Sequence, residues 1–152
     1  MKTKIEKNYC YTGLGFPVEL EQVEMVKLGG EWHPKVDVRK VASEVINLLA
    51  TKDSVLTGSE VRFIRTHLDM SLREFGDKVV HESHAAVRKW EEKGDKPTAM
   101  NPNTEFVIRN FIIEQALSKA EKKSRYYSRV SKAKEFFKPT MARKPLHVSN
   151  CA

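Results

Sequence analysis

Residues 57–97 read TGSEVRFIRTHLDMSLREFGDKVVHESHAAVRKWEEKGDKP and carry the clearest structural pattern in the chain. Thr57 and Glu60 form a T-x-x-E capping box, which predicts that a helix begins there. Ser71 and Glu74 repeat the pattern, so a second, short helix is expected soon after the first one ends. The apolar residues behind each box recur at helical spacing, which supports both predictions.

A third helix is predicted at residues 84–93, where only Val87 and Trp90 are strongly apolar. Two anchors leave most of the helix surface exposed, as a recognition helix requires if its outer side chains are to enter a major groove about 12 Å wide. With the polar break at residues 81–83, the three helices predict a helix-turn-helix. A fourth helix is expected from Pro102. The outward candidates for DNA contact are Ser83, His84, Ala85, Arg88 and Lys89.

Two segments of this region resemble the Cro-like, phage-repressor-like helix-turn-helix family: LDMSLREFGDKV at residues 68–79 and HAAVRKWEEKGDKP at residues 84–97. The resemblance implies a structural ion pair between Arg65 and Glu91. It also implies that the start of the second helix faces phosphate and that the outer face of the third helix reads bases. The full set of predicted DNA contacts is Ser71, Arg73, Ser83, His84, Ala85, Arg88, Lys89 and Lys93.

The spacing between the second and third helices departs from that family. The stretch from Phe75 to Trp90 is one residue longer than the family pattern. We therefore expect an altered turn at residues 80–83, which changes the register of individual base contacts.

The N-terminal part of the chain predicts a small sheet followed by a helix. Residues 8–36 have strand-like alternation with a phase slip near Gln22 that suits a β-bulge. The Gly29-Gly30 pair predicts a tight hairpin turn, and Pro34 restricts the returning strand to a sheet edge. Asp37 is expected to cap a helix that ends near Lys52.

A narrower resemblance covers residues 8–115 and is carried by YCYTGL at residues 9–14 and VLTGSEVRFIRTHLDMSLREFG at residues 55–76. These stretches are similar to the MqsA-type antitoxin family, which joins an N-terminal toxin-binding domain to a C-terminal helix-turn-helix that dimerises on operator DNA and represses its own operon. Many members bind zinc through two CxxC pairs. This chain has KLGGEWHPKVD where the second pair is expected, so zinc is not implied.

The resemblance makes a basic ribonuclease toxin a possible partner for the N-terminal sheet. Acidic side chains at the rim of an interface steer a basic partner toward it. The plainer interpretation is a solvated strand face. Trp32 is either packed on the N-terminal helix or an exposed anchor for a partner. The candidate toxin-binding residues are Glu19, Glu21, Glu24 and Trp32.

The net charge of +7 is concentrated at the C-terminus, because residues 119–152 contain ten Lys and Arg against two Glu, which is +8 and leaves −1 for the rest. A surplus of this kind suits phosphate binding, since each neutralised phosphate releases counterions. The alternative is a solvated tail. The interleaved Tyr126, Tyr127, Phe136 and Phe137 are expected to dock a helix on its own protein or on a dimer mate, or else to stack on nucleic acid.

Other features limit the function classes. The N-terminus has no apolar core of a signal peptide and the chain has no membrane-span pattern, so a cytoplasmic, nucleoid-associated location is expected. Cys10 and Cys151 form no CxxC pair, so no metal is expected. No P-loop, HExxH or nucleophile elbow is present, so we expect neither an enzyme nor a cofactor, and no catalytic residues.

The expected fold is mainly α: a Cro/repressor-like helix-turn-helix bundle at residues 53–118, a small α+β N-terminal domain at residues 1–52, and a basic helical extension and tail at residues 119–152. The expected function is a sequence-specific repressor that binds a double-stranded operator as a homodimer, in an autoregulating toxin-antitoxin operon. The alternatives are a stand-alone regulator without a toxin partner, and an RNA-binding module that uses the basic tail.

Overall fold

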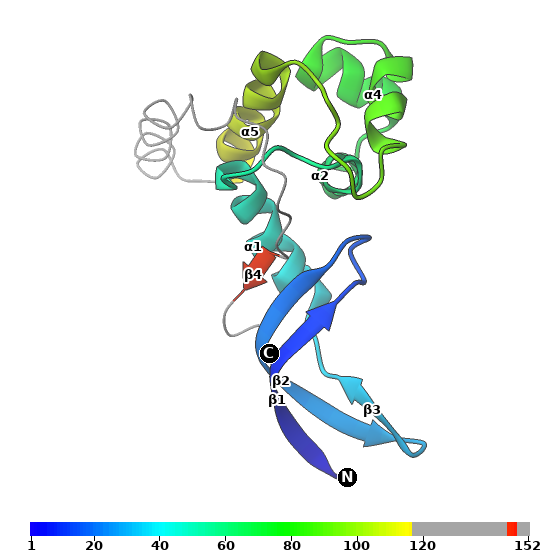
Figure 1. The fold of residues 1–152 in the computed structure, drawn as a ribbon, viewed down its shortest axis with the longest axis vertical. Helices are drawn as coiled ribbons and strands as arrows, with labels where there is room; N and C mark the ends of the chain where they lie inside the picture. Colours follow the sequence, from blue (N-terminus) through cyan, green and yellow to red (C-terminus); the bar gives the residue numbers. More distant parts are fainter. Residues whose placement is uncertain (117–145, 149–152) are drawn as a thin grey trace. The chain divides into compact units, whose positions relative to one another are not determined.

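The computed structural model describes residues 1–116 and 146–148 (Figure 1). The described residues form two compact units, one of Met1–Val45 with strand β4 (Leu146–Val148) and one of residues 46–116. The division falls inside helix α1 (Val38–Thr51). The expected basic extension and tail lie outside the described residues, apart from β4.

The first unit is built on strand β2 (Val18–Leu28), which is the centre of its sheet. Strand β1 (Thr3–Tyr11) pairs antiparallel along one edge of β2. On the other edge, strand β3 (Glu31–Pro34) pairs antiparallel with one end of β2, and β4 pairs parallel with the other end. Figure 1 shows β1 and β2 as two long strands that twist around each other.

The hairpin between β2 and β3 confirms the predicted turn. Leu28 lies opposite Glu31, so Gly29 and Gly30 alone form the connection. Both have positive φ, +56° and +90°. A two-residue hairpin loop of type I′ requires positive φ at both central positions, and glycine adopts it without a steric penalty. Pro34 lies in β3, which pairs only with β2 in the described part of the chain, as expected for an edge strand.

The phase slip near Gln22 is confirmed, but the predicted bulge is wrong. Val18 and Leu20 are buried before Gln22, and Val23 and Met25 after it. The register stays one-to-one across the break, so no residue is inserted. Instead, Gln22 adopts a left-handed conformation with φ +53°, which moves the alternation by one residue and keeps the apolar side chains on one face.

The N-terminal helix begins where it was predicted to begin. Asp37 Oδ1 accepts hydrogen bonds from the backbone N–H groups of Arg39 and Lys40, at 3.1 and 3.2 Å. These bonds satisfy two of the donors that a helix N-terminus otherwise leaves unpaired. The buried side of α1 includes Val41, Val45 and Leu49.

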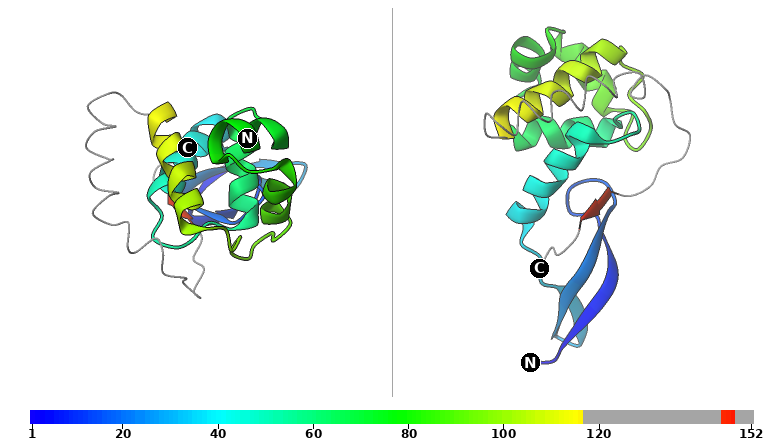
Figure 2. Two further views of the ribbon diagram at one scale, coloured as in Figure 1. Left: turned by 90° about the horizontal axis from the view of Figure 1, so that it is seen from above. Right: turned by 90° about the vertical axis from the view of Figure 1, so that its left-hand side faces the viewer.

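The second unit contains the helices that follow α1. Their bounds are α2 (Gly58–His67), α3 (Leu72–Phe75), the π-helical turn η1 (Gly76–Val80), α4 (His84–Glu91) and α5 (Pro102–Ala116). Helix α4 packs against α2 and α3, and α5 packs against η1 (Figure 2). Fully buried apolar side chains from these elements and from the segment before α2 form its core, among them Leu56, Val61, Ile64, Phe75, Val87, Ile108 and Ile112.

The predicted helix starts of this unit are confirmed. Thr57 and Glu60 form a complete capping box, with the Thr57 hydroxyl accepting from Glu60 N and the Glu60 carboxylate accepting from Thr57 N. Ser71 Oγ accepts from Glu74 N at 3.1 Å at the start of α3.

The expectation of a mainly α fold is wrong. The chain is α+β: among the described residues about 48% lie in helices and about 23% in strands. The sheet is larger than expected because β1 begins at Thr3 rather than near residue 8, and most of the β1 side chains are exposed. A strand exposed on both faces lacks the alternation that marks a half-buried strand. No helix in the described residues has the length and apolarity needed to cross a membrane.

Candidate nucleic-acid interface

Helix α4 divides into a buried half and an exposed half. Val87 is fully buried, Trp90 is half-buried, and the Glu91 side chain is mostly buried. His84, Ala85, Arg88 and Lys89 are all exposed. At 3.6 residues per turn these four side chains lie within an arc of about 140°. The helix therefore presents one continuous polar face, as its two apolar residues predicted.

The C-terminal end of α4 is fixed to the first turn of α2. A Cβ atom on Gly58 would meet the carbonyl oxygen of Trp90 and lie 2.7 Å from Gly94 N, so only glycine fits at this position. Ser59 N donates to Gly94 O at 2.8 Å, and Gly58 N donates to Lys96 O at 3.2 Å. These backbone contacts hold the end of α4 without using its outer side chains.

The ion pair implied between Arg65 and Glu91 is present. Arg65 Nη2 donates to Glu91 Oε1 at 2.9 Å, and Nε donates to the same oxygen at 3.1 Å. Arg65 Nη1 also donates to Met70 O at 2.9 Å, which ties the pair to the loop before α3. Both side chains are mostly buried, so the pair joins α2, α4 and this loop.

The connection between the second and third helices begins with the π-helical turn η1, before residues 80–83, where an altered turn was expected. A π-helical turn accommodates one residue more than an α-helical turn. It is followed by His81 in the left-handed conformation (φ 54°), and Glu82 N donates to Gly76 O at 3.1 Å. A Cβ atom on Gly76 would lie 2.5 Å from Glu82 O, so the turn closes tightly on η1.

All predicted DNA contacts are exposed in the structure. The eight residues are Ser71, Arg73, Ser83, His84, Ala85, Arg88, Lys89 and Lys93. Ser71 and Ser83 are the N-caps of α3 and α4, and the Ser83 hydroxyl accepts from Ala86 N at 3.2 Å. Each hydroxyl proton stays available for donation to an anion. The other six residues lie on or directly after these two helices.

A groove of about 330 Å³ lies beside this face and was not predicted. Its lining comes from α2, α3, α4 and the residue that caps α4, and consists of Arg62, Arg65, Leu72, Arg88, Glu91 and Glu92. Arg62 is an exposed cation of this groove that was not among the predicted contacts. No local motif marks it, because the groove is created by the packing of three helices.

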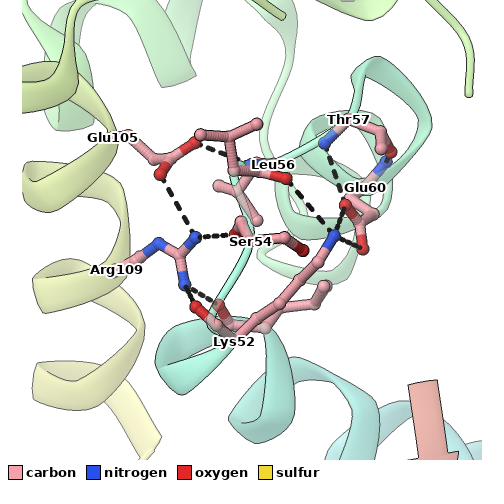
Figure 3. A network of polar contacts seen from close by, with 9 residues as sticks. Lys52, Ser54, Leu56, Thr57, Glu60, Glu105 and Arg109 are labelled. Atoms are coloured by element: carbon pink, nitrogen blue, oxygen red, sulfur yellow. Dashed lines mark hydrogen bonds and ion pairs between the residues drawn. The ribbon is translucent and has the colours of Figure 1, made fainter. Parts of the chain in front are cut away.

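A buried charged network supports the N-terminus of α2 (Figure 3). Lys52 Nζ lies 2.6 Å from Glu60 Oε1 and also donates to Val55 O at 3.3 Å. Glu60 is the residue that completes the capping box with Thr57. The link from α1 to α2 is therefore held by the same carboxylate that caps α2.

Arg109 of α5 binds the other side of this link (Figure 3). It is 0% exposed, and its guanidinium donates to Leu49 O at 3.0 Å and to Lys52 O and Ser54 O at 2.7 Å each. Glu105 pairs with it at 3.2 Å. Burial lowers the pKa of Arg109, an effect that the nearby Glu105 charge opposes. The guanidinium nevertheless stays charged at neutral pH.

The candidate toxin-binding residues lie on two different faces of the sheet. Glu19, Glu21 and Glu24 alternate with the buried residues of β2 and share the opposite face because of the slip at Gln22. Trp32 lies opposite Lys27 on the face of the buried residues.

Trp32 is exposed, as one of the two expectations requires, and its role as an anchor for a partner stays a prediction. The residue is 36% exposed, and Lys4 Nζ and Lys27 Nζ lie 4.9 Å and 5.9 Å from the centroid of its ring. These distances are those of cation–π contacts. The four candidate residues therefore do not form a single surface.

Within the described residues, no three His, Cys, Asp or Glu side chains are placed to hold a metal ion. Comparison of the chain with protein-family models, curated proteins and solved structures finds no match. The resemblances to the phage-repressor-like and MqsA-type families therefore stay predictions that depend on the quoted residues.

Proposed function

We propose that this protein is a sequence-specific DNA-binding repressor that reads duplex DNA with the exposed face of α4. The observation that carries the proposal is the division of α4: Val87 is fully buried, while His84, Ala85, Arg88 and Lys89 are exposed together. The close approach of Gly58 to the backbone at the end of α4 and the ion pair between Arg65 and Glu91 fix the helix without using these four side chains. A rigid helix with a free polar face has the form that enters a major groove.

The proposed mechanism uses two copies of the chain on one operator. Their α4 helices enter successive major grooves about 34 Å apart, which requires an operator with an inverted repeat. Arg73 and Ser71 at the start of α3 contact backbone phosphate, and the basic segment at residues 119–152 adds sequence-independent attraction. Occupied DNA is then closed to transcription.

Replacement of Lys89 by alanine tests base reading. A lysine that donates to a guanine edge contributes about 1 to 3 kcal/mol of discrimination, so Lys89→Ala relaxes the preference at one base pair. The matched control is Lys96→Ala, which removes the same charge from an exposed position outside α4. An equal loss of affinity for all duplex sequences in Lys89→Ala, with no change of preference, would contradict base reading.

A role as antitoxin is the second candidate function, and the acidic face of β2 favours it. Three carboxylates on one sheet face attract a basic partner and speed its association. If a ribonuclease toxin binds there, the triple substitution of Glu19, Glu21 and Glu24 by glutamine slows association and flattens its dependence on salt. A stand-alone regulator would form no stable complex with the product of the adjacent gene.

An RNA-binding function depends on the basic aromatic segment, which lies outside the described residues. It predicts tighter binding to single strands than to duplex, because unstacked bases offer their faces to aromatic side chains. A direct competition between duplex DNA and single-stranded RNA distinguishes this alternative from repression.

A further inference from the structure

The arginines that line the groove beside α4 differ in how tightly a carboxylate pairs with them. Arg65 is paired with Glu91, and these two side chains are only 14% and 9% exposed. Arg88 and Glu92 are about two-thirds exposed, and their closest atoms are 3.8 Å apart. An exposed pair at this distance contributes little and exchanges its partner easily. The Arg88 guanidinium is therefore available to another anion.

Arg62 is the second available cation of the groove. It is exposed on α2, and within the described residues it makes no ion pair. Leu72 supplies an apolar part of the lining, and the acidic lining groups are Glu91, which Arg65 already binds, and Glu92. The groove thus offers an anion two guanidinium groups from different helices.

Guanidinium groups favour a phosphate in such a position. Their planar fork of N–H donors matches two phosphate oxygens, which gives both strength and direction to the contact. Arg88 also belongs to the exposed face of α4, beside His84 and Lys89. An anion held by Arg88 and Arg62 therefore lies next to whatever that face binds.

We propose that Arg62 and Arg88 together bind one backbone phosphate of the DNA duplex, so that the interface extends from α4 onto α2. This inference rests on the proposed DNA binding. It adds Arg62 as a positioning contact, which fixes the register of α4 in the groove without reading sequence.

The salt dependence of duplex binding tests the contribution of Arg62. Complete loss of one phosphate contact reduces the steepness of log K against log salt by about 0.9, which corresponds to about eightfold weaker binding at 0.1 M salt. Arg62→Ala leaves Arg88 on the same phosphate, so we expect a reduction in steepness and in affinity up to these amounts. Arg62→Ala should show this loss equally on specific and random duplexes. Arg62→Lys should keep the slope because it keeps the charge, and thermal melting checks that both variants are folded.

Glu92→Gln is the matched variant of opposite sign. It removes a carboxylate from the groove and frees Arg88, so duplex binding becomes tighter by severalfold. A residue with a purely structural role would not raise affinity when it is neutralised. Unchanged or weaker binding by Glu92→Gln would contradict the shared phosphate contact.

The outcomes separate this inference from the proposed function. If the unaltered chain binds duplex DNA and Arg62→Ala keeps its salt slope, the phosphate contact is overturned and repression stands. If the unaltered chain binds no duplex, both are overturned. A third outcome combines two results. Inorganic phosphate, compared with chloride at equal ionic strength, raises the melting temperature of the unaltered chain but not of Arg62→Ala, and the salt slopes of duplex binding are the same for both proteins. In that case the groove binds a free phosphate instead of a DNA phosphate.

Discussion

Replacement of Arg109 by leucine tests the energetic role of the buried network most directly. The substitution removes three hydrogen bonds to the backbone oxygens of Leu49, Lys52 and Ser54, together with the ion pair to Glu105. Leucine fills part of the volume but donates no hydrogen bond. Glu105, only 4% exposed, then lacks its cationic partner.

The expected loss is large relative to the stability of a small unit. Removing one partner of a buried ion pair costs about 3 to 5 kcal/mol, out of a total free energy of unfolding of about 5 to 15 kcal/mol. With a urea m-value of about 1.5 kcal/mol per molar, the midpoint of unfolding falls by about 2 to 3 M. Arg73→Leu, at an exposed position, should change stability by only about 0.5 kcal/mol or less.

Urea unfolding followed by Trp90 fluorescence is the appropriate assay. Trp32 is replaced by phenylalanine in all variants, so that the signal comes from the helical unit alone. The decisive comparison is between Arg109→Leu alone and the double variant that carries both Arg109→Leu and Glu105→Gln. Glutamine removes the unpaired charge and can still accept from Leu56 N, a bond of 2.7 Å in the unaltered protein.

The double variant should therefore be more stable than Arg109→Leu alone. Two results would refute a stabilising role of this buried pair. One is a free energy of unfolding of Arg109→Leu within about 1 kcal/mol of the unaltered protein, and the other is no gain in that free energy when Glu105→Gln is added to Arg109→Leu.

Two further substitutions test the attachment of α4 and the turn before it. Gly58→Ala should destabilise the helical unit by about 1 to 3 kcal/mol, because the added Cβ would meet the backbone of Trp90 and Gly94. The neighbouring substitution Ser59→Ala should leave the stability nearly unchanged. Equal melting temperatures for the two variants would contradict the close approach of α2 to the end of α4. His81→Gly should stabilise the helical unit by about 1 kcal/mol and raise its melting temperature by about 4 to 8 °C, because glycine adopts the left-handed conformation without strain. The control His84→Gly, in the first turn of α4, should destabilise the unit. A fall in melting temperature for His81→Gly would contradict a strained backbone at this position.

The features that sequence predicted correctly are local. Capping of α1 by Asp37, the capping box at Thr57 and the turn at Gly29-Gly30 each depend on residues within three positions of one another. Local chemistry selects such geometry without help from the rest of the fold. The exposed face of α4 was predicted for the same reason, since two apolar residues define its buried side.

The features that sequence missed depend on distant contacts. Arg109 binds backbone oxygens of residues 55 to 60 positions earlier, and backbone oxygens leave no mark in a sequence. Strand β1 was recognised only in part because its pairing with β2, rather than burial of its own side chains, determines its length. Arg62 joins the candidate interface only because α2, α3 and α4 pack around one groove.

The proposed function requires the exposed face of α4 to read the sequence of duplex DNA. Selection of the full chain on a random duplex pool at about 0.15 M salt measures this sequence preference. We expect an enriched inverted repeat with half-sites about 10 base pairs apart, and a change of preferred base within each half-site for Lys89→Ala. A pool that stays random, or an enriched site that Lys89→Ala and His84→Ala leave unchanged, would contradict the proposed function.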